Sequence, residues 1–510
     1  MNNTCGNKRI LTLVIPLFTA LLIFMSTGCD NKKPANLTIL HTNDIHGHFT
    51  PGEAYWLNHK PLIGGMAALD YYIDSIRASS GNCLVLDAGD LMTGNLICDM
   101  EYKGAEGGAL IEMMNIIGYD GMVPGNHEFD KPIENTRALL SLADFPVYCA
   151  NFVNEDGGYF CEMPYHIYEI NGIDVGVIGI TYHPMAGMAK PEYLGGFNSL
   201  EPASVVNDMV KKIDPVTDLI IVLSHLGYDK DLDLAEHIQN VDVIVGGHSH
   251  TRVEEPKAVN GILVVQAGSK TTNLGRLDLT VAGDSIQNFR GELIPAFAEN
   301  IKPDERLAAF VDSFSTIIDK KYGEVIGQLK EDWISKYRDE SNVGNFLTDA
   351  IRRTTGADVA FLNSGGIRKN IPAGDITLKD ISEMLPFMNY VVAFECTGEE
   401  LLEILHENAK AAACETHGTL QLSGVKYAWR KVAGDAEIVN VSVNGKALKK
   451  DRIYKIATVD YVVLNQDKYF NIQPGELENS GTLLSDMITE YIRKVKTIKP
   501  IKINRIRQIT

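Results

Sequence analysis

The sequence predicts an α/β protein with two domains, and three observations support this fold class. Short apolar runs alternate with amphipathic stretches over residues 37–298, which is the pattern of strands and helices that follow one another in an α/β domain. A second series of such runs begins at residue 323. The length of 510 residues exceeds that of one ordinary domain. The composition, 45% hydrophobic and 22% charged, is that of a globular protein and excludes disordered and fibrous classes.

The N-terminus has the pattern of a bacterial lipoprotein signal. Two basic residues precede an apolar run over residues 10–25, and Cys29 follows shortly after it. We therefore predict a signal peptide over residues 1–28, lipid attachment at Cys29 and a polar tether over residues 29–36. This predicts an exported protein that lipid anchors to the membrane of the cell envelope, on the periplasmic side or at the cell surface. An uncleaved membrane anchor is the alternative, for which the apolar run is somewhat short.

The chain is acidic. Its formal charge is −19 at pH 7, and loss of residues 1–28, which hold two basic and no acidic side chains, would make it −21. Such a surface repels polyanions, and the sequence contains no basic stripe that could follow a nucleic-acid backbone. We therefore expect no binding of long nucleic acids, although bound metal ions would still attract a small phosphate ester. The sequence predicts no particular protein partner.

Six cysteines follow Cys29, and none of them is part of a C-x-x-C motif. A thiolate metal site is therefore not expected. Export permits disulfides. Pairing of Cys149 with Cys161, pairing of Cys396 with Cys414, and free buried thiols all remain open from the sequence.

Apolar runs in the first domain predict buried strands. The clearest runs are residues 83–86, 175–180, 219–223, 241–245 and 262–265. Residues 67–77 and 108–117 have the spacing of helices. This order predicts βαβ units, with an antiparallel contribution near residue 260.

A charged segment over residues 299–322 has the period of a helix. Its apolar residues fall on one face: Leu307, Phe310, Val311, Phe314 and Ile318. We expect this helix to link the two domains, so that residues 37–298 form the first domain and residues 323–510 form the second.

Five polar motifs each follow an apolar run of the first domain. The motifs contain Asp44 with His46, Asp90, residues 126–130, His225, and His248 with His250. Ligands of open α/β sheets bind beyond the carboxyl ends of the strands. We therefore expect all five motifs at one shared sheet edge.

These residue types are those of a site for two divalent metal ions. Carboxylate and amide oxygens suit hard cations, and imidazole suits zinc, manganese or a similar ion. Eleven of the 13 histidines lie at or before residue 250, so this supply of ligands belongs to the first domain. Two ions that share a carboxylate can bind a phosphate ester and activate a water for attack on it. The sequence therefore predicts a two-metal phosphoesterase site.

The order of the motifs carries a family resemblance. They read Asp44-x-His46, Gly89-Asp90, Gly125-Asn126-His127-Glu128, His225 and Gly247-His248-Ser249-His250. In this order they resemble the motifs of the calcineurin-like metallophosphoesterases. The second domain resembles that of the 5′-nucleotidase family, which includes UDP-sugar hydrolases and 2′,3′-cyclic nucleotide phosphodiesterases. The resemblance implies a sandwich of mixed sheets flanked by helices for residues 37–298, and a substrate-binding domain for residues 323–510.

The resemblance also implies a ligand set for two divalent ions of zinc, manganese or a similar metal. Asp44, His46 and His250 would bind the first ion. Asn126, His225 and His248 would bind the second ion. Asp90 would bridge the two ions.

Other residues of the same motifs would have different roles. By the resemblance, His127, oriented by Asp130, would stabilise the phosphoryl transition state and assist the leaving group. We expect Asp87 to hydrogen-bond the turn at Gly89, and Glu128 to be structural.

In the second domain the resemblance implies a nucleoside site. Its residues would be Asn363, Arg368, Phe387, Tyr461 and Asp467. Phe387 and Tyr461 would sandwich the base and Asp467 would reach the ribose hydroxyls, whereas packing in the core is the alternative for the two aromatic residues. The sequence departs from the family at two places. Asn342 stands where nucleoside monophosphate hydrolases tend to have an arginine, and a Gly-Gly turn is missing before Asp467.

We therefore expect a lipid-anchored enzyme that hydrolyses nucleotide phosphoesters outside the cytoplasm with two divalent metal ions. The expected activity is that of a 5′-nucleotidase, which releases nucleoside and phosphate; 2′,3′-cyclic nucleotide phosphodiesterase and UDP-sugar hydrolase are alternatives. A noncatalytic surface lipoprotein that binds a nucleotide or a protein partner is an alternative of another class. The His127–Asp130 pair and the full ligand set oppose it, because binding alone requires neither.

Overall fold

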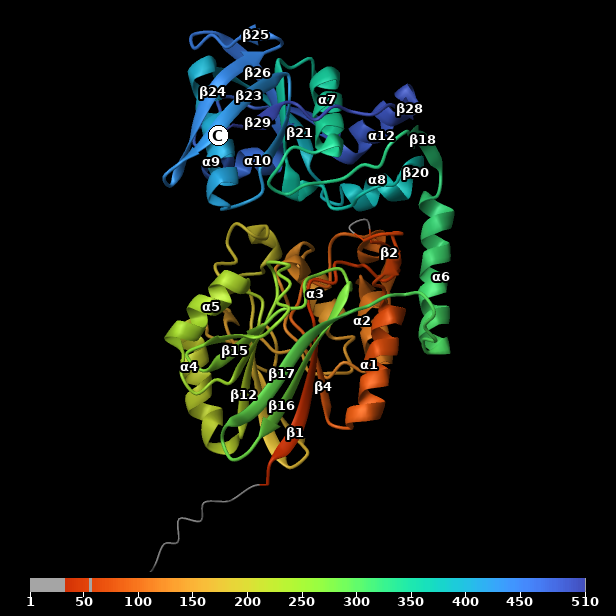
Figure 1. Cartoon of the computed structure of the whole chain (residues 1–510), viewed down its shortest axis with the longest axis vertical. Coiled ribbons are helices and arrows are strands. Elements are labelled where there is room, and N and C mark those ends of the chain that lie inside the picture. The colour runs from red at the N-terminus through yellow and green to blue at the C-terminus, as the bar shows by residue number, and fades with distance from the viewer. Residues whose placement is uncertain (1–32, 55–56, 510) are drawn as a thin grey trace, which may run out of the picture.

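The computed structural model describes residues 33–54 and 57–509, which form two α/β domains stacked end to end (Figure 1). The predicted fold class is confirmed, with a sandwich of mixed sheets flanked by helices in the first domain. Within these ranges no helix has both the length and the apolar character needed to cross a membrane. The predicted signal peptide and Cys29 lie outside the described residues.

Two sheets form the first domain. The first sheet has the strand order β17 (Ile286–Pro295), β16 (Asn273–Val281), β1 (Ala35–Thr42), β4 (Cys83–Asp87) and β7 (Gly121–Met122). The second has the order β14 (Lys257–Val259), β15 (Ile262–Val265), β13 (Val243–Gly246), β12 (Leu219–Ser224), β10 (Ile173–Ile180) and β9 (Tyr165–Ile170). The central strands pair in parallel, and β16, β17, β9 and β14 pair antiparallel to their neighbours.

The core of the first domain lies between the two sheets, and helices cover the outer faces. Ile39 and Leu86 from the first sheet pack in one cluster with Val177 and Leu223 from the second. The first sheet is covered by α1 (Met66–Ser80) and α2 (Gly108–Ile117), and the second by α4 (Pro202–Ile213) and α5 (Tyr228–His237). Figure 1 shows the helices on both sides of the strands. Because central strands are buried on both faces, they appear as continuous apolar runs in the sequence.

The expectation of one shared sheet edge was wrong. The strands that precede Asp44, Asp90 and Asn126 belong to the first sheet, whereas those that precede His225 and His248 belong to the second. Central strands of both sheets give the same apolar runs, so the pattern does not indicate which sheet a strand joins. The motifs nevertheless meet, because the parallel strands of both sheets end at the same end of the sandwich.

Most of the predicted elements are present. The runs at 83–86, 175–180, 219–223 and 262–265 fall within β4, β10, β12 and β15, and the predicted helices fall within α1 and α2. β13 begins at Val243 rather than at residue 241, and just before it the carboxylate of Asp242 accepts a hydrogen bond from the backbone N–H of Ile220 (2.8 Å). The antiparallel contribution near residue 260 is confirmed by the pairing of β14 with β15.

Helix α6 (Glu305–Tyr322) connects the domains but packs on the first one. It begins later than the predicted residue 299, because Pro303 disfavours helix in the residue before it and the Asp304 carboxylate caps the helix by accepting from the Leu307 N–H (2.9 Å). Its buried face consists of Leu307, Val311, Phe314 and Ile318, which belong to the same core cluster as α1 and α2. The helix is therefore part of the first domain rather than a free linker.

The second domain is built on a sheet of order β22 (Leu420–Ser423), β19 (Val359–Asn363), β26 (Ile453–Val459), β21 (Tyr390–Thr397) and β27 (Glu478–Leu483). The domain also has two smaller sheets. One has the strand order β20 (Gly374–Thr377), β18 (Val325–Leu329) and β28 (Thr497–Ile498). The other has the order β25 (Lys446–Ala447), β24 (Asp435–Val443), β23 (Val425–Val432) and β29 (Ile506–Gln508). Its helices are α7 (Asn342–Thr355), α8 (Leu378–Met384), α9 (Gly398–Cys414), α10 (Asp460–Leu464), α11 (Gln466–Tyr469) and α12 (Leu484–Val495). These elements share one core cluster, which is separate from that of the first domain.

The remaining elements of the first domain are short. They are α3 (Ile133–Leu140), β2 (Gly52–Glu53), β3 (Leu62–Ile63), β5 (Glu101–Tyr102), β6 (Ala105–Glu106), β8 (Phe152–Val153) and β11 (Asn198–Ser199). The first turn of α3 lies shortly after the motif at residues 125–130.

The six cysteines of the described ranges all have free thiols. Neither of the two disulfides left open by the sequence is formed, and the alternative of free thiols holds. Burial raises the pKa of Cys149 to about 11 and that of Cys98 to about 12, so both are protonated at neutral pH.

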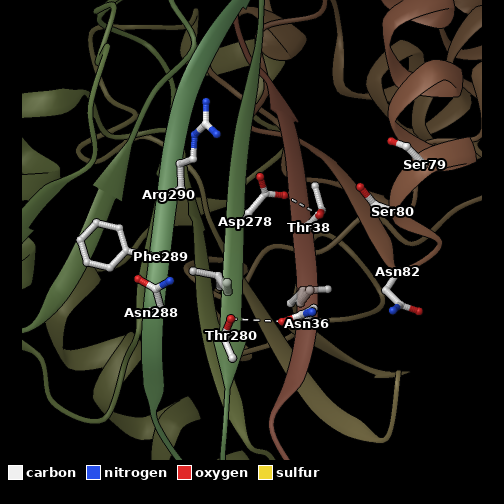
Figure 2. A pocket seen from close by; sticks show the side chains of 12 residues that line it. Asn36, Thr38, Ser79, Ser80, Asn82, Asp278, Thr280, Asn288, Phe289 and Arg290 are labelled. Carbon is white, nitrogen blue, oxygen red and sulfur yellow. Dashed lines mark hydrogen bonds between the residues drawn. The ribbon is translucent and has the colours of Figure 1, made fainter.

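A pocket of about 390 Å³ lies near the start of β1. Figure 2 shows polar side chains around it, including Ser80, Asn82 and Arg290. Thr38 donates to Asp278 (2.7 Å) and Thr280 donates to Asn36 (3.1 Å), so these groups join β1 to β16. The polar motifs follow the opposite end of β1, so this pocket is remote from them.

Candidate metal centre

The ends of five strands place the predicted ligands at one end of the sandwich, facing the second domain (Figure 1). Three sets of side chains have ligand atoms within 4.8 Å of one another: Asp44, His46 and His250; His46, Asp90 and His127; and Asp90, His225 and His248. Asp90 belongs to two of these sets and His46 to two, so the three sets form one continuous group.

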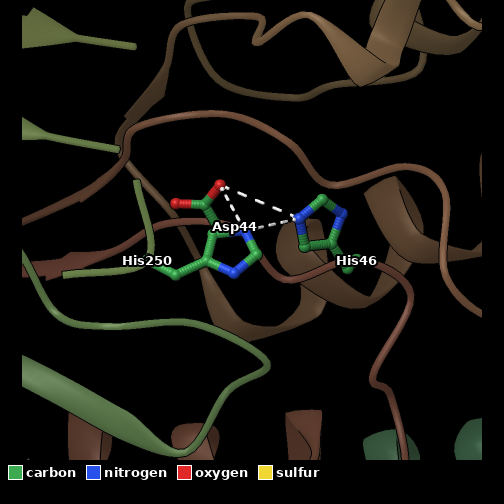
Figure 3. A group of neighbouring side chains, drawn as sticks. All are labelled: Asp44, His46 and His250. Carbon is green, nitrogen blue, oxygen red and sulfur yellow. Dashed lines mark hydrogen bonds and ion pairs between the residues drawn. The ribbon is translucent and has the colours of Figure 1, made fainter. Parts of the chain in front are cut away.

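Asp44, His46 and His250 converge from the loops after β1 and β13 (Figure 3). Asp44 Oδ1 lies 3.3 Å from His250 Nε2 and 3.8 Å from His46 Nε2. The two imidazole Nε2 atoms lie 3.0 Å apart. Three ligand atoms that face one common point in this way are arranged to hold one cation.

The second half of the group is formed by Asp90, Asn126, His225 and His248. His225 Nε2 lies 3.1 Å from Asp90 Oδ2, and Asn126 Oδ1 lies 2.8 Å from His248 Nδ1. Asp90 Oδ2 is also 3.9 Å from His46 Nε2. The Asp90 carboxylate therefore lies between the two halves, in the position that a bridging ligand requires.

Asp44 Oδ1 is buried without a hydrogen-bond partner among the described residues, and buried His225 Nε2 has only the ion-pair contact with Asp90. Burial of a carboxylate oxygen without a partner is unfavourable unless a cation neutralises it. Oxygen and imidazole nitrogen together suit zinc, manganese and similar divalent ions. The residues therefore fit two divalent metal ions.

The backbone at this group is strained. Five of the seven predicted ligands have positive φ values: Asp44 (53°), His46 (50°), Asp90 (58°), His248 (73°) and His250 (56°). Residues other than glycine seldom adopt this region, and such strain is concentrated at functional sites. The loops are held in place by hydrogen bonds, among them Asp44 N–H to Gly89 O (2.8 Å) and His46 N–H to Asp90 O (3.0 Å).

The side chain of Glu128 joins two of the ligand loops. Its carboxylate accepts from the backbone N–H groups of Asp90 (3.1 Å), Leu91 (2.8 Å), Met92 (3.0 Å) and Gly125 (2.6 Å). Burial, and then the charge of Asp90, raise its pKa to about 6. Glu128 is structural, as predicted, and its contacts fix the loop that carries Asp90 against the loop that carries Asn126.

The predicted role of Asp87 is also confirmed. Asp87 Oδ1 accepts from the Gly89 N–H (2.9 Å), and Oδ2 accepts from the Thr42 hydroxyl (2.7 Å). Gly89 has a φ of +88°, and a Cβ atom there would lie 2.6 Å from the backbone nitrogen of Gly125. Only glycine therefore allows the two ligand loops to approach this closely.

His127 is oriented by Asp130. His127 Nδ1 lies 2.6 Å from Asp130 Oδ2, and the Thr93 hydroxyl donates to the same oxygen (2.7 Å). Nε2 of His127 lies 4.0 Å from Asp90 Oδ2, on the side of the metal ligands. Burial alone would lower the pKa of His127, but the carboxylates of Asp130 and Asp90 outweigh it and raise the pKa to about 9. The imidazole therefore holds a proton that it can donate.

The second domain brings Arg368 and Phe387 to this group. Arg368 Nη2 lies 3.3 Å from His46 Nε2, and the guanidinium carbon is 5.8 Å from the centroid of the Phe387 ring. The Phe387 ring centroid is in turn 6.2 Å from that of His127. Two predicted substrate residues therefore lie directly over the candidate metal ligands.

The other predicted substrate residues lie further from the ligands. Tyr461 is 37% exposed, and its ring centroid is 6.5 Å from that of Tyr469. Asn363 is buried with Oδ1 unpartnered among the described residues, and Asp467 is exposed at the start of α11. Neither Phe387 nor Tyr461 is buried in the domain core, so the alternative of core packing does not hold for them.

Asn342, which replaces a family arginine, has a structural role. Its Oδ1 accepts from the Ile334 N–H (2.9 Å) and its Nδ2 donates to the Asp332 carbonyl (2.8 Å). Both contacts fix the segment before α7. Its side chain is therefore engaged by the backbone of the same domain.

Sequence reasoning missed three residues of this region, Thr93, Lys270 and Tyr337. Thr93 supports Asp130, and Lys270 Nζ donates to the Arg368 carbonyl (2.6 Å). Tyr337 is 55% exposed, and its ring lies beside Gly365, where a Cβ atom would be 3.4 Å from it. These residues lie in loops with no motif and contact partners far along the chain, so no local pattern could have indicated them.

Comparison with known proteins gives matches in both domains. Residues 37–252 match the family model of calcineurin-like phosphoesterase, and residues 325–473 match that of the 5′-nucleotidase C-terminal domain. A 5′-nucleotidase of Vibrio cholerae serotype O1 is 30% identical, over 96% of this chain and 97% of that protein.

Solved structures give the same result. The crystal structure of a 5′-nucleotidase precursor from Thermus thermophilus has a TM-score of 0.83 and 29% identity, over 93% of this chain and 99% of that one. The sulfate thiohydrolase SoxB of Thermus thermophilus has a TM-score of 0.78 and covers 93% of this chain and 96% of that one. Its identity is 20%, so this likeness concerns the fold alone.

The contacts of Glu128 generate a prediction about metal binding. Glu128→Gln replaces one acceptor oxygen by an N–H₂ group that faces backbone donors, so the loops of Asp90 and Asn126 lose their common support. Residues that support metal ligands in this way typically contribute about 10- to 100-fold to metal affinity. Titration of the metal-free protein with zinc or manganese should show a loss of that size. The control is Glu134→Gln, an exposed residue of α3, and equal affinities in the two variants would contradict the role of Glu128.

Proposed function

The chain belongs to the metallophosphoesterase family that includes the 5′-nucleotidases. On that premise we propose that it hydrolyses nucleotide phosphoesters outside the cytoplasm. We propose that its substrates are 5′-nucleotides, from which it releases nucleoside and phosphate. Membership confirms the resemblance of its motifs, and the protein is a metal-dependent phosphoric ester hydrolase of the 5′-nucleotidase type. We further propose that the enzyme uses two metal ions, that the residues named above form its site, and that 5′-nucleotides are its substrates.

One observation carries the proposal, the approach of Arg368 and Phe387 to the candidate metal ligands. The arginine comes within 3.3 Å of His46, and the Phe387 ring lies 6.2 Å from His127. A guanidinium group pairs with phosphate oxygens, and an aromatic ring offers a face for a nucleobase. A phosphatase for small esters would need the first of these groups but not the second.

The proposed role of each residue follows from its position in the site. Asp44, His46 and His250 would hold one divalent ion, Asn126, His225 and His248 would hold the other, and Asp90 would be shared by both. Two ions held in this way supply Lewis-acid stabilisation of the phosphoryl group and an activated water. His127 carries a proton on Nε2, because Nδ1 is engaged by Asp130, and donates it to the leaving oxygen. Arg368 neutralises phosphoryl oxygens from the side of the second domain.

The alternatives that the sequence left open involve the same metal ligands. A 2′,3′-cyclic nucleotide phosphodiesterase and a UDP-sugar hydrolase would differ in what the second domain encloses. A noncatalytic nucleotide-binding protein would have no use for a proton on His127 that Asp130 and Thr93 keep oriented. Phosphate release from AMP, 2′,3′-cyclic AMP, UDP-glucose and a small aliphatic phosphate separates these activities.

The first prediction of this proposal concerns the nucleoside. Stacking of a base on an aromatic ring contributes about 1–3 kcal/mol by alanine substitution. Phe387→Ala and Tyr461→Ala should therefore each lower kcat/KM for AMP by about ten- to a hundredfold. Hydrolysis of a small aliphatic phosphate should change little, because such a substrate reaches the metal ligands without filling the base site.

The control for the nucleoside prediction is Phe289→Ala, an exposed aromatic residue of β17 that lines the pocket of Figure 2. It should leave both activities unchanged. Equal losses on AMP and on the aliphatic phosphate in the Phe387 and Tyr461 variants would remove the nucleotide assignment.

A second prediction separates metal binding from proton transfer. Asp90→Ala removes the carboxylate between the two halves of the ligand group and should abolish both activity and the binding of two ions per chain. His127→Ala should retain the metal and lower kcat by about 10²- to 10⁴-fold, the range for a positioned proton donor. Elemental analysis of the two purified variants measures the metal. An active Asp90→Ala protein would rule out the bridged pair of ions.

We also propose that the protein is exported and anchored by lipid through Cys29. The support is the basic pair Lys8 and Arg9, the apolar run at residues 10–25 and the position of Cys29 after it. Two or more acyl chains at one cysteine give stable membrane attachment, which a single chain does not. Cys29→Ser should block lipid attachment and release the protein from the membrane fraction. Mass spectrometry of the wild-type mature protein should show acylated Cys29 as its first residue, and an unmodified N-terminus elsewhere would contradict this proposal.

A further inference from the structure

Lys270 makes a contact between the two domains that the catalytic proposal does not use. Its Nζ atom donates a hydrogen bond of 2.6 Å to the backbone carbonyl of Arg368. Lys270 lies in the loop before β16 of the first domain, and Arg368 lies in the loop after β19 of the second. The bond therefore joins the candidate metal centre to the segment that carries the phosphate-binding arginine.

The loop that presents Lys270 is itself fixed to the metal centre. The Lys270 N–H donates to the Asp44 carbonyl (2.8 Å), so the lysine is bonded to the backbone of a candidate ligand. The hydroxyl of Thr271 accepts from the Gly65 N–H (2.6 Å) and lies 3.1 Å from the His48 carbonyl. Lys270 and Thr271 both have a φ of 58°, a strained conformation for these residues. The turn is held in one shape, and the direction of the lysine side chain is held with it.

The hydrogen bond to the Arg368 carbonyl is the polar contact of the Lys270 side chain. Neighbouring Lys369 is paired with Asp380 (2.9 Å) and Glu383, so those two carboxylates are already engaged. Lys270 has no ion pair among the described residues, so its side chain is directed to the backbone of the Arg368 loop.

Arg368 is thus held from both domains. Its N–H donates to the Met384 carbonyl within the second domain (2.9 Å), and its carbonyl accepts from Lys270 of the first. Its guanidinium group then reaches His46, at 3.3 Å, and the face of Phe387. Without the lysine, nothing described at the Arg368 backbone ties this loop to the first domain.

We propose that Lys270 is a positioning residue that holds the Arg368 loop over the metal centre, so that the guanidinium group meets the phosphoryl oxygens. This inference rests on the proposed phosphoesterase function and adds a residue to it. Lys270 acts through Arg368 and does not itself touch the reacting atoms.

A double-mutant cycle tests whether Lys270 acts through Arg368. Lys270→Met keeps the length of the side chain but removes the donor, and Arg368→Met removes the guanidinium group. Because removal of the donor leaves the Arg368 carbonyl without its partner in the first domain, Lys270→Met should lower kcat/KM by about tenfold or more. In the Arg368→Met background the same change should have almost no further effect. Lys270→Arg, which keeps a donor, should recover part of the loss.

Binding of inorganic phosphate gives a second measurement that does not depend on the substrate. Calorimetry on the metal-loaded protein should show weaker phosphate binding in Lys270→Met and in Arg368→Met, by a similar factor. The double variant should bind no more weakly than the Arg368 variant. Metal content and the melting temperature of Lys270→Met should match those of the wild type.

Lys60→Met is the matched control. Lys60 of the first domain also bonds to the second domain, with 2.6 Å between its Nζ and Asp332 Oδ2, but this ion pair is exposed. Exposed pairs contribute little, so Lys60→Met should change kcat/KM less than about twofold.

Multiplicative losses in the Lys270 and Arg368 double variant would overturn the positioning role, and so would equal effects of Lys270→Met and Lys60→Met. Failure of the proposed function has a different signature. In that case the wild-type protein would release no phosphate from any nucleotide, while the phosphate-binding cycle would still report on Lys270.

Discussion

The crowding of buried carboxylates and imidazoles at one end of the sandwich is the constraint on which the rest of the structure depends. Asp44 Oδ1 is buried without a hydrogen-bond partner among the described residues, buried His225 Nε2 has only the ion-pair contact with Asp90, and five candidate ligands have a left-handed backbone. Backbone strain of this kind is unfavourable by about 1–3 kcal/mol at each residue. Such loops persist because the surrounding contacts leave them no other shape: Glu128 accepts four backbone N–H groups, and Gly89 lets two loops touch. The two-sheet core supplies the rigid base for both.

The two domains are joined by the segment after helix α6 and by contacts at the end of the sandwich that carries the candidate ligands. Helix α6 is fixed to the first domain by Leu307, Val311, Phe314 and Ile318, which share its core. Any relative motion of the domains must therefore begin after Tyr322, where α6 ends and β18 follows. Away from this connection in the sequence, Arg368 of the second domain contacts His46 and Lys270 of the first domain. The covalent link and these contacts, together with the ion pairs of Lys60 with Asp332 and of Asp319 with Lys379, join the two domains.

Sequence periodicity was sufficient to predict the central strands and most of the expected helices, because strands buried on both faces are continuous apolar runs in the sequence. The periodicity could not predict which strands belong to which of the two sheets, because the central strands of both sheets are the same kind of apolar run. The candidate ligands could be predicted because they lie in short polar motifs after strands, and the order of these motifs resembles that of a known family. Lys270 and Thr93 could not, because their roles come from contacts with Arg368 and Asp130, which are distant in the chain and unrelated to any local pattern. The start of α6 was missed because capping by Asp304 after a proline outweighs the apolar period of the helix.

In the proposed function the side chains at the end of the sandwich would hold metal ions and contact the phosphoryl group, so selectivity among phosphoesters would arise in the second domain. What the second domain adds is aromatic surface and an unpartnered polar atom of a predicted substrate residue. Phe387 lies beside His127, Tyr461 and Tyr337 are partly exposed, and Asn363 Oδ1 is buried without a partner among the described residues. A buried carbonyl oxygen without a donor is unfavourable unless a ligand supplies one. A substrate with a planar ring and a hydrogen-bond donor would satisfy both features, and a nucleoside has both, whereas an aliphatic phosphate lacks the ring.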